Sequence, residues 1–192
     1  MRSWKDFLIG LVIGVACIIA GIACYFQFGF APVAVSAAPM PFERYLAHAA
    51  MHSSKEHGSG VPSPVEPTEA NLLAGARKYR SACAVCHSLP GAGKTELQKG
   101  MYPAPPLLLT GKGVTDDPVG VTHWVIQNGI RMTGMPSFDK AFSDQELWQV
   151  SLLLSRAHDL PPAVLDLLKQ PDNVPGLPAN ANSNYSPNTA RP

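Results

Sequence analysis

Five consecutive residues, Cys83-Ala84-Val85-Cys86-His87, place two thiols and an imidazole at a spacing that suits a porphyrin. The C-x-x-C-H pattern is typical of the covalent attachment of c-type haem. Two thiolates add across the two vinyl groups of one porphyrin, and the imidazole that follows reaches the iron. The composition of the chain would produce this pattern by chance in only about three chains per thousand. The sequence therefore predicts one covalent haem c on Cys83 and Cys86, with His87 as an axial ligand.

Two other uses of the cysteine pair fit the sequence less well. A thioredoxin-like pair belongs in a βαβ unit, whereas apolar residues from Leu72 to Cys83 recur at helical spacing. A four-ligand zinc site needs two further donors, and the remaining cysteines, Cys17 and Cys24, lie in an apolar N-terminal segment. Haem attachment is therefore favoured over thiol exchange and over zinc.

The helix that presents this motif is expected to begin near Thr68, whose hydroxyl is a suitable N-cap. Residues 88–110 follow the motif and are rich in Gly and Pro, and the run 103–109 within them cannot form a regular helix. A second helix is predicted over Val119–Asn128, with Asp117 as its N-cap and Pro118 as its first helical residue.

A third helix is predicted from the capping box that begins at Ser143 and includes Glu146, and it should end near His158. Residues 163–169 add one or two helical turns, and residues 171–192 have the composition of a disordered tail. Sustained strand-type alternation is absent from the sequence. The predicted fold class is therefore all-α, with the domain wrapped around a large apolar cofactor.

The N-terminal segment is long and apolar enough to cross a bilayer. Residues 7–42 contain no Asp, Glu, Lys or Arg, and residues 8–26 are nearly continuously apolar. Arg2 and Lys5 precede the span, so the positive-inside rule places everything after Phe30 on the outer side of the membrane. The sequence therefore predicts an uncleaved membrane anchor.

Two alternatives to a simple anchor remain open. A signal peptidase could cleave after residues 35–37, although the apolar run is longer than a usual signal h-region. A lipoprotein signal at Cys24 is weaker, because Gly21 stands where Leu is normal. Separately, Gly10 and Gly14 form a G-x-x-x-G pair that would let a partner transmembrane helix approach closely.

The sequence thus divides into four parts. These are a transmembrane anchor over 1–30, a linker with a short helix near 42–52 over 31–67, a haem domain over 68–160, and a largely disordered tail over 161–192. The formal net charge of +1 and the 15% of charged residues give no reason to invoke nucleic acid.

The sixth ligand of the iron decides what such a haem can do, because an occupied site carries electrons and an open one binds gases or peroxide. Met135 is the favoured candidate, since Gly134 and Pro136 hold an extended backbone around it. The weaker candidates are Met132, Met101 and His123.

The C-x-x-C-H and G-M-P motifs, in this order, make the domain resemble a class I cytochrome c of the membrane-anchored bacterial monohaem type. The resemblance implies three main helices around one haem, with His87 and Met135 as the axial ligands. It also implies that a carbonyl in the proline-rich loop, matched here by Pro105, accepts a hydrogen bond from the proximal imidazole. Finally, it implies that Gly75 and Tyr79 of the first helix contact the surface of the last helix that bears Trp148 and Leu152.

Trp124 and Arg131 are candidate contacts to the haem propionates. The alternatives are a place in the core for Trp124 and solvation for Arg131.

Together these features predict an electron carrier tethered to the inner membrane of a bacterium, with its haem domain on the periplasmic side. Its partners would be an electron donor and an electron acceptor protein, within a respiratory or dehydrogenase complex or outside one. A haem enzyme or a gas or redox sensor is the alternative if Met135 is absent from the iron or displaceable. No catalytic residue is predicted.

Overall fold

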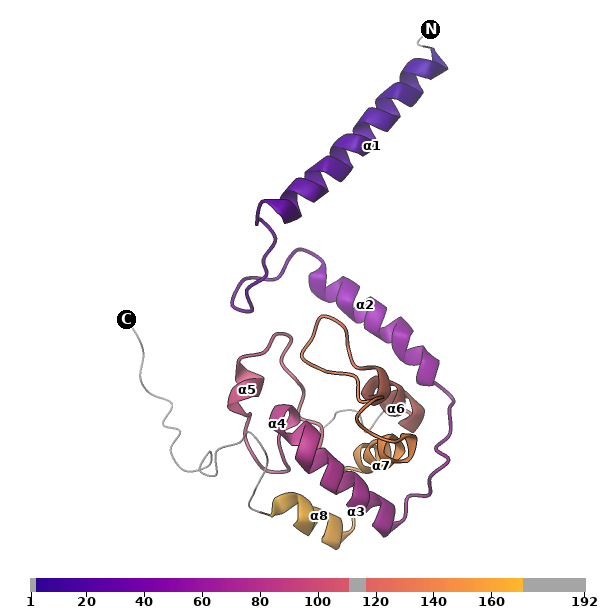
Figure 1. Cartoon of the computed structure of the whole chain (residues 1–192), viewed down its shortest axis with the longest axis vertical. Helices are drawn as coiled ribbons and strands as arrows, with labels where there is room; N and C mark the ends of the chain where they lie inside the picture. The colour runs from indigo at the N-terminus through magenta and orange to yellow at the C-terminus, as the bar shows by residue number, and fades with distance from the viewer. Residues whose placement is uncertain (1–2, 111–116, 171–192) are drawn as a thin grey trace, which may run out of the picture. The chain divides into compact units, whose positions relative to one another are not determined.

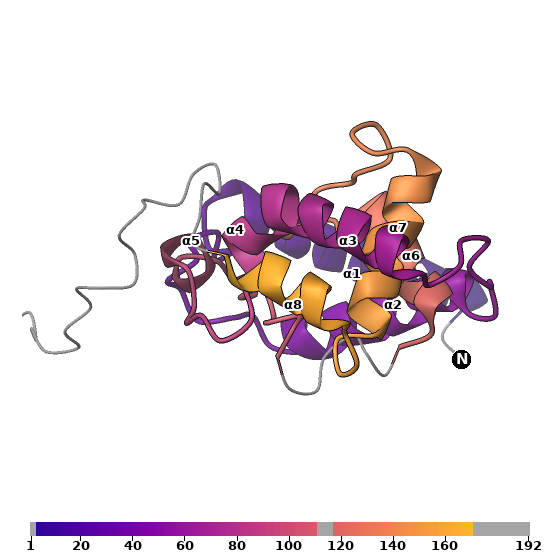
Figure 2. The same cartoon turned by 90° about the horizontal axis from the view of Figure 1, so that it is seen from below.

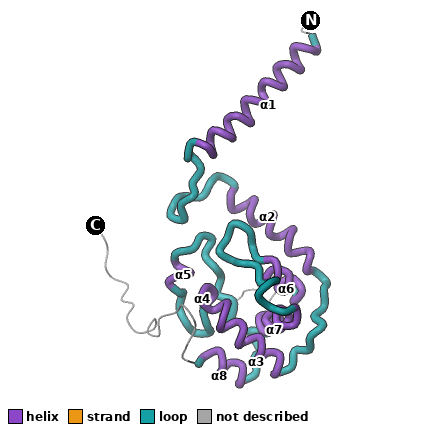
Figure 3. The backbone as a smooth tube through the Cα atoms, in the orientation of Figure 1, coloured by secondary structure: helices purple, strands orange, loops and turns teal. Residues whose placement is uncertain are grey.

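The computed structural model describes residues 3–110 and 117–170, which divide into two compact units at the boundary between residues 49 and 50. Each unit is described by itself. All regular elements among the described residues are helical, as Figure 3 shows, so the predicted all-α class is confirmed for this part of the chain.

The first unit contains α1, a helix of 24 residues over Trp4–Gln27. The Ser3 hydroxyl and the Asp6 carboxylate form a capping box at its start, which satisfies free N–H groups of the first turn. None of its residues is buried, and the helix is apolar and long enough to span a membrane (Figure 1). Length and composition alone support this, and a signal sequence has the same properties.

The helix expected near residues 42–52 is present as α2 (Glu43–Lys55), which runs from the first unit into the second. The second unit holds the remaining elements, of which Figure 1 labels the α-helices. The remaining elements are η1 (Glu56–Gly58), α3 (Glu69–Lys78), the π-turn η2 (Tyr79–Cys83), α4 (Ala84–His87), α5 (Glu96–Lys99), α6 (Val119–Asn128), α7 (Asp144–Ser155) and α8 (Pro162–Lys169).

The core of this unit lies where α3 crosses α7, and the predicted contact of first and last main helices is present. A β-carbon on Gly75 would meet the backbone carbonyl of Gln149 and lie 3.2 Å from the nitrogen of Val150. Only glycine lets the two backbones approach this closely. Trp148 faces elsewhere, because its ring stacks on His123 of α6 with 3.9 Å between ring centroids.

We expect Gly75→Ala to lower the free energy of unfolding by roughly 2 kcal/mol, because the added methyl group pushes α3 away from α7. Alanine is the better helix former, so helix propensity would act in the opposite direction. Urea unfolding of the variant measures the effect. Gly93→Ala is the control, since a β-carbon there meets no atom within 4 Å. Equal stability of the two variants would contradict the close approach.

Two helix boundaries differ from the sequence prediction. The N-cap of α6 is Pro118, not Asp117, and the helix begins at Val119. The Asp117 carboxylate instead pairs with the Lys55 ammonium group at 2.6 Å, so it makes no cap. The last main helix, α7, ends at Ser155 rather than near residue 158. Its Ser143 and Glu146 capping box is confirmed.

The helix α8 packs into the core of the second unit, beyond residue 160, where the sequence analysis expects the domain to end. Val164 and Leu168 lie one turn apart and are fully buried in the core. The Arg80 guanidinium donates to the carbonyl of Leu167 at 2.7 Å and to that of Gln170 at 3.1 Å, at the C-terminal end of α8. Figures 1 and 2 both show α8 beside α3. The tail predicted over 171–192 lies outside the described residues.

Part of the predicted linker also packs on the domain. Gly58 of η1 is buried, and a β-carbon there would meet the backbone carbonyl of Gly120 in α6. Beside this contact the His57 ring stacks on Trp124, with 5.7 Å between ring centroids. The segment between α2 and α3 is therefore docked at its start, because two glycines allow the backbones to touch.

Candidate haem site

The C-x-x-C-H motif lies where α3 continues through the π-turn η2 into the short helix α4 (Figure 1). A π-turn widens a helix by one residue and often marks a functional site. Here it ends at Cys83, whose side chain is buried, while Cys86 and His87 are half-buried in α4. Cys83 and Cys86 are both free thiols.

Burial raises the pKa of both motif thiols. It raises the pKa of Cys83 to about 12, with a smaller contribution from the charge of Cys86. Burial also raises the pKa of Cys86. Thiol oxidoreductases depend on a lowered cysteine pKa, because the thiolate is the attacking species. The shift in this pair is thus opposite in direction to the shift in thiol oxidoreductases.

The imidazole of His87 is held by the proline-rich loop. Its Nδ1 lies 2.8 Å from the carbonyl oxygen of Pro106, and a carbonyl only accepts, so Nδ1 carries the proton. This tautomer leaves the lone pair of Nε2 for a metal ion. Burial lowers the pKa of His87, and the bond to Pro106 partly opposes this. A neutral imidazole is the form that binds iron.

The carbonyl that holds His87 corrects the sequence prediction by one residue. Pro105 was the expected acceptor, but its carbonyl accepts from the side-chain amide of Gln98 instead. Successive carbonyls of an extended chain point in roughly opposite directions, so only one of the two prolines can serve His87. The structure assigns that role to Pro106.

The loop that carries Met135 is held firmly at the backbone. The Met135 N–H donates to Thr133 Oγ1 at 3.1 Å, and its carbonyl accepts from the N–H of Ile130 at 3.1 Å. Gly129 has a φ of +67°, and a β-carbon there would lie 2.6 Å from the carbonyl carbon of Pro136. These contacts fix the backbone from which the Met135 thioether projects, half-buried.

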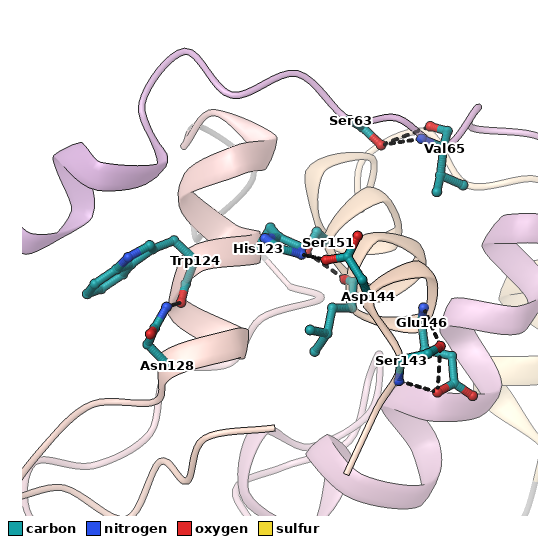
Figure 4. A network of polar contacts seen from close by, with 10 residues as sticks. Ser63, Val65, His123, Trp124, Asn128, Ser143, Asp144, Glu146 and Ser151 are labelled. Carbon is teal, nitrogen blue, oxygen red and sulfur yellow. Dashed lines mark hydrogen bonds and ion pairs between the residues drawn. The ribbon is translucent and has the colours of Figure 1, made fainter. Parts of the chain in front are cut away.

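The weaker ligand candidates occupy different environments. Met132 is 93% exposed, and its φ of +60° lies in the left-handed region. The Met101 methyl group fills the space beside Gly134. His123 Nε2 lies 3.0 Å from Asp144 Oδ1, as Figure 4 shows, so that nitrogen already has a partner. Met135 as the sixth ligand stays a prediction.

The donor set fits a covalent haem c. Cys83 and Cys86 are free thiols separated by two residues. The next residue, His87, has its Nδ1 bonded to Pro106, which leaves its Nε2 available. Cys83, Cys86 and His87 would hold the group, and the Met135 loop would complete the coordination.

Comparison with known families concerns the domain that contains these residues. Residues 70–152 match the family model described as "Cytochrome C oxidase, cbb3-type, subunit III". These residues form a c-type cytochrome domain. A chain of the reducing HAO-like protein complex of Kuenenia stuttgartiensis is 27% identical, with a TM-score of 0.44. That match covers 51% of this chain and 47% of the other, so it spans about half of each. No curated protein matched the chain.

A buried tyrosine supports the haem motif of the cytochrome domain. The Tyr79 hydroxyl donates to the carbonyl of Ser88 at 2.8 Å and lies 3.3 Å from that of His87. Its side chain is fully buried, which raises the pKa of Tyr79 well above its usual range. The sequence placed this residue only on the helix face, because a bond to residues eight and nine positions later leaves no local signal.

We expect Tyr79→Phe to lower the free energy of unfolding by about 1–2 kcal/mol, because the two carbonyls lose a buried donor. Thermal unfolding measures the loss. The matched control is Tyr102→Phe, at a side chain that is 44% exposed, and its effect should be close to zero. A Tyr79→Phe variant as stable as this control would contradict the assigned role.

The residues proposed for the propionates lie on α6 and just after it. Figure 4 shows Trp124 leaving α6 on the side opposite to His123, and its ring partner is His57. Arg131 is exposed, which agrees with the alternative that its side chain is solvated. Contacts of Trp124 and Arg131 with propionates stay predictions.

Proposed function

We propose that this chain is a membrane-tethered monohaem cytochrome that transfers single electrons between redox proteins outside the cytoplasmic membrane of a bacterium. The observation that carries the proposal is the bond of His87 Nδ1 to the Pro106 carbonyl beside two free thiols. This arrangement leaves Nε2 for iron and suits thioether attachment.

Bound haem would supply a one-electron iron couple. Cys83 and Cys86 would hold it covalently, and the His87 imidazole, oriented by Pro106, would act as the strong donor on one side. The soft thioether of Met135 would favour Fe(II) and so raise the potential. If His87 and Met135 both bind the iron, the site would have no place for a substrate, so we propose a carrier rather than an enzyme.

The apolar helix α1 supports the membrane part of the proposal. Arg2 and Lys5, at the N-terminal end of the apolar span, favour a cytoplasmic N-terminus, which would place the cytochrome domain on the periplasmic side. Gly10 and Gly14 have open space around them, which suits a partner transmembrane helix. The matched family model describes an oxidase subunit, which supports membership in a respiratory or dehydrogenase complex with donor and acceptor proteins as partners.

The proposal is tested on the full chain, produced in a bacterium that attaches haem c. We expect one haem per chain that survives denaturation, recovery in the membrane fraction, and cleavage of the domain by protease added to the outer face. The oxidised protein should show the far-red sulfur-to-iron(III) band. Two alkylatable motif thiols without haem would overturn the proposal. A haem protein that lacks the band and binds carbon monoxide would support the enzyme or sensor alternative.

A further inference from the structure

The short helix α5 contains a buried polar side chain that the proposed function does not use. Gln98 is 1% exposed, although α5 has only four residues. Its amide nitrogen Nε2 donates to the carbonyl of Pro105. Burying an amide is costly unless it makes a hydrogen bond. The bond to Pro105 therefore offsets part of the cost of burying this amide.

The acceptor of that bond is the peptide next to the one that holds the haem ligand. Pro105 and Pro106 have no N–H, so their backbone polar groups are the carbonyls alone. The Pro105 carbonyl accepts from Gln98, and the Pro106 carbonyl accepts from His87 Nδ1 at 2.8 Å. Because the proline ring restricts the φ of Pro106, fixing the first carbonyl narrows the directions that the second can take.

The other end of α5 is anchored to the haem motif itself. The Gln98 backbone N–H donates to Thr95 Oγ1 at 3.0 Å, and the Thr95 hydroxyl donates to the carbonyl of Val85 at 2.8 Å. Val85 lies between the two motif cysteines. Both views in Figures 1 and 2 show α5 beside α4. The helix α5 therefore links the motif to the loop that holds its histidine.

We propose that Gln98 is a positioning residue that sets the Pro106 carbonyl against His87 and thereby tunes the reduction potential of the haem. The proposal rests on the electron-transfer function proposed above. A hydrogen bond from Nδ1 to a carbonyl makes the imidazole a stronger donor, which stabilises Fe(III) and lowers the potential. Loosening the Pro106 carbonyl weakens that bond, so the potential should rise.

The test is Gln98→Met in the full, haem-loaded chain, because methionine has a similar volume and no donor. We expect haem content to stay at the wild-type level and the midpoint potential to rise. Proton NMR should show the His87 Nδ1 proton exchanging with solvent about tenfold faster, as the loss of one net hydrogen bond implies. The exchange rate reports on His87 without any electron-transfer assay.

The matched control is Ser151→Ala. Ser151 is fully buried on α7, and its hydroxyl donates to the carbonyl of Leu147 at 2.8 Å (Figure 4). It therefore has the same kind of buried side-chain bond, away from the proline-rich loop. We expect this variant to lose stability in thermal unfolding and to keep the wild-type potential and Nδ1 exchange rate.

A Gln98→Met protein with wild-type potential and wild-type exchange would overturn the inference and leave the proposed function intact. An equal potential shift in Ser151→Ala would also overturn it, since core loosening would then be the cause. If Gln98→Met fails to load haem, Gln98→Asn replaces it, because its amide is one methylene short of Pro105. A wild-type chain that takes up no covalent haem would instead refute the proposed function, and this inference with it.

Discussion

The double variant Cys83→Ser and Cys86→Ser is expected to abolish covalent haem attachment, because a hydroxyl forms no thioether with a porphyrin vinyl group. Haem that survives denaturation and acid–acetone extraction should fall from one per chain to about none. Each single variant should keep one thioether. Its pyridine haemochrome band should move to longer wavelength, since one vinyl group stays conjugated.

The matched control replaces the other two cysteines, Cys17 and Cys24, which lie on the exposed surface of α1. The Cys17→Ser and Cys24→Ser protein should retain full covalent haem. Equal haem loss in both double variants would show that the attachment site has been misassigned. Full retention in the motif variant would leave the C-x-x-C-H pattern without its proposed chemistry.

The second large effect is expected for Met135→Ala, which removes the soft sulfur donor and leaves water or an open position on the iron. The far-red band should disappear, and the potential should fall by on the order of 0.1–0.3 V. Axial ligands set haem potentials over a range of roughly 0.8 V, so this shift is a moderate part of that range. Spectroscopy and redox titration of the full chain measure both effects.

Met132→Ala is the matched control, because Met132 lies in the same loop and is 93% exposed. It should leave the band and the potential at their wild-type values. If Met132→Ala loses the band and Met135→Ala keeps it, the sixth ligand is Met132. If neither variant loses the band, Met101 is the next residue to replace, since its methyl group lies beside Gly134.

The sequence alone determined those features that depend on neighbours along the chain. The spacing of Cys83, Cys86 and His87 defines their chemistry whatever surrounds them. Likewise, Thr68 and Ser143 cap the helices that follow them, as predicted, because a cap involves only residues within one turn.

The tertiary structure decided which groups meet across the fold. Eight consecutive residues of α7, Leu147–Leu154, are buried, so its pattern has no single apolar face and could not show that Gln149 approaches Gly75. The choice of Pro106 over Pro105 depends on Gln98, which occupies the other carbonyl. The chemistry of the motif residues therefore follows from their spacing along the chain. The orientation of His87 and the inclusion of α8 in the core result from packing between segments distant in sequence.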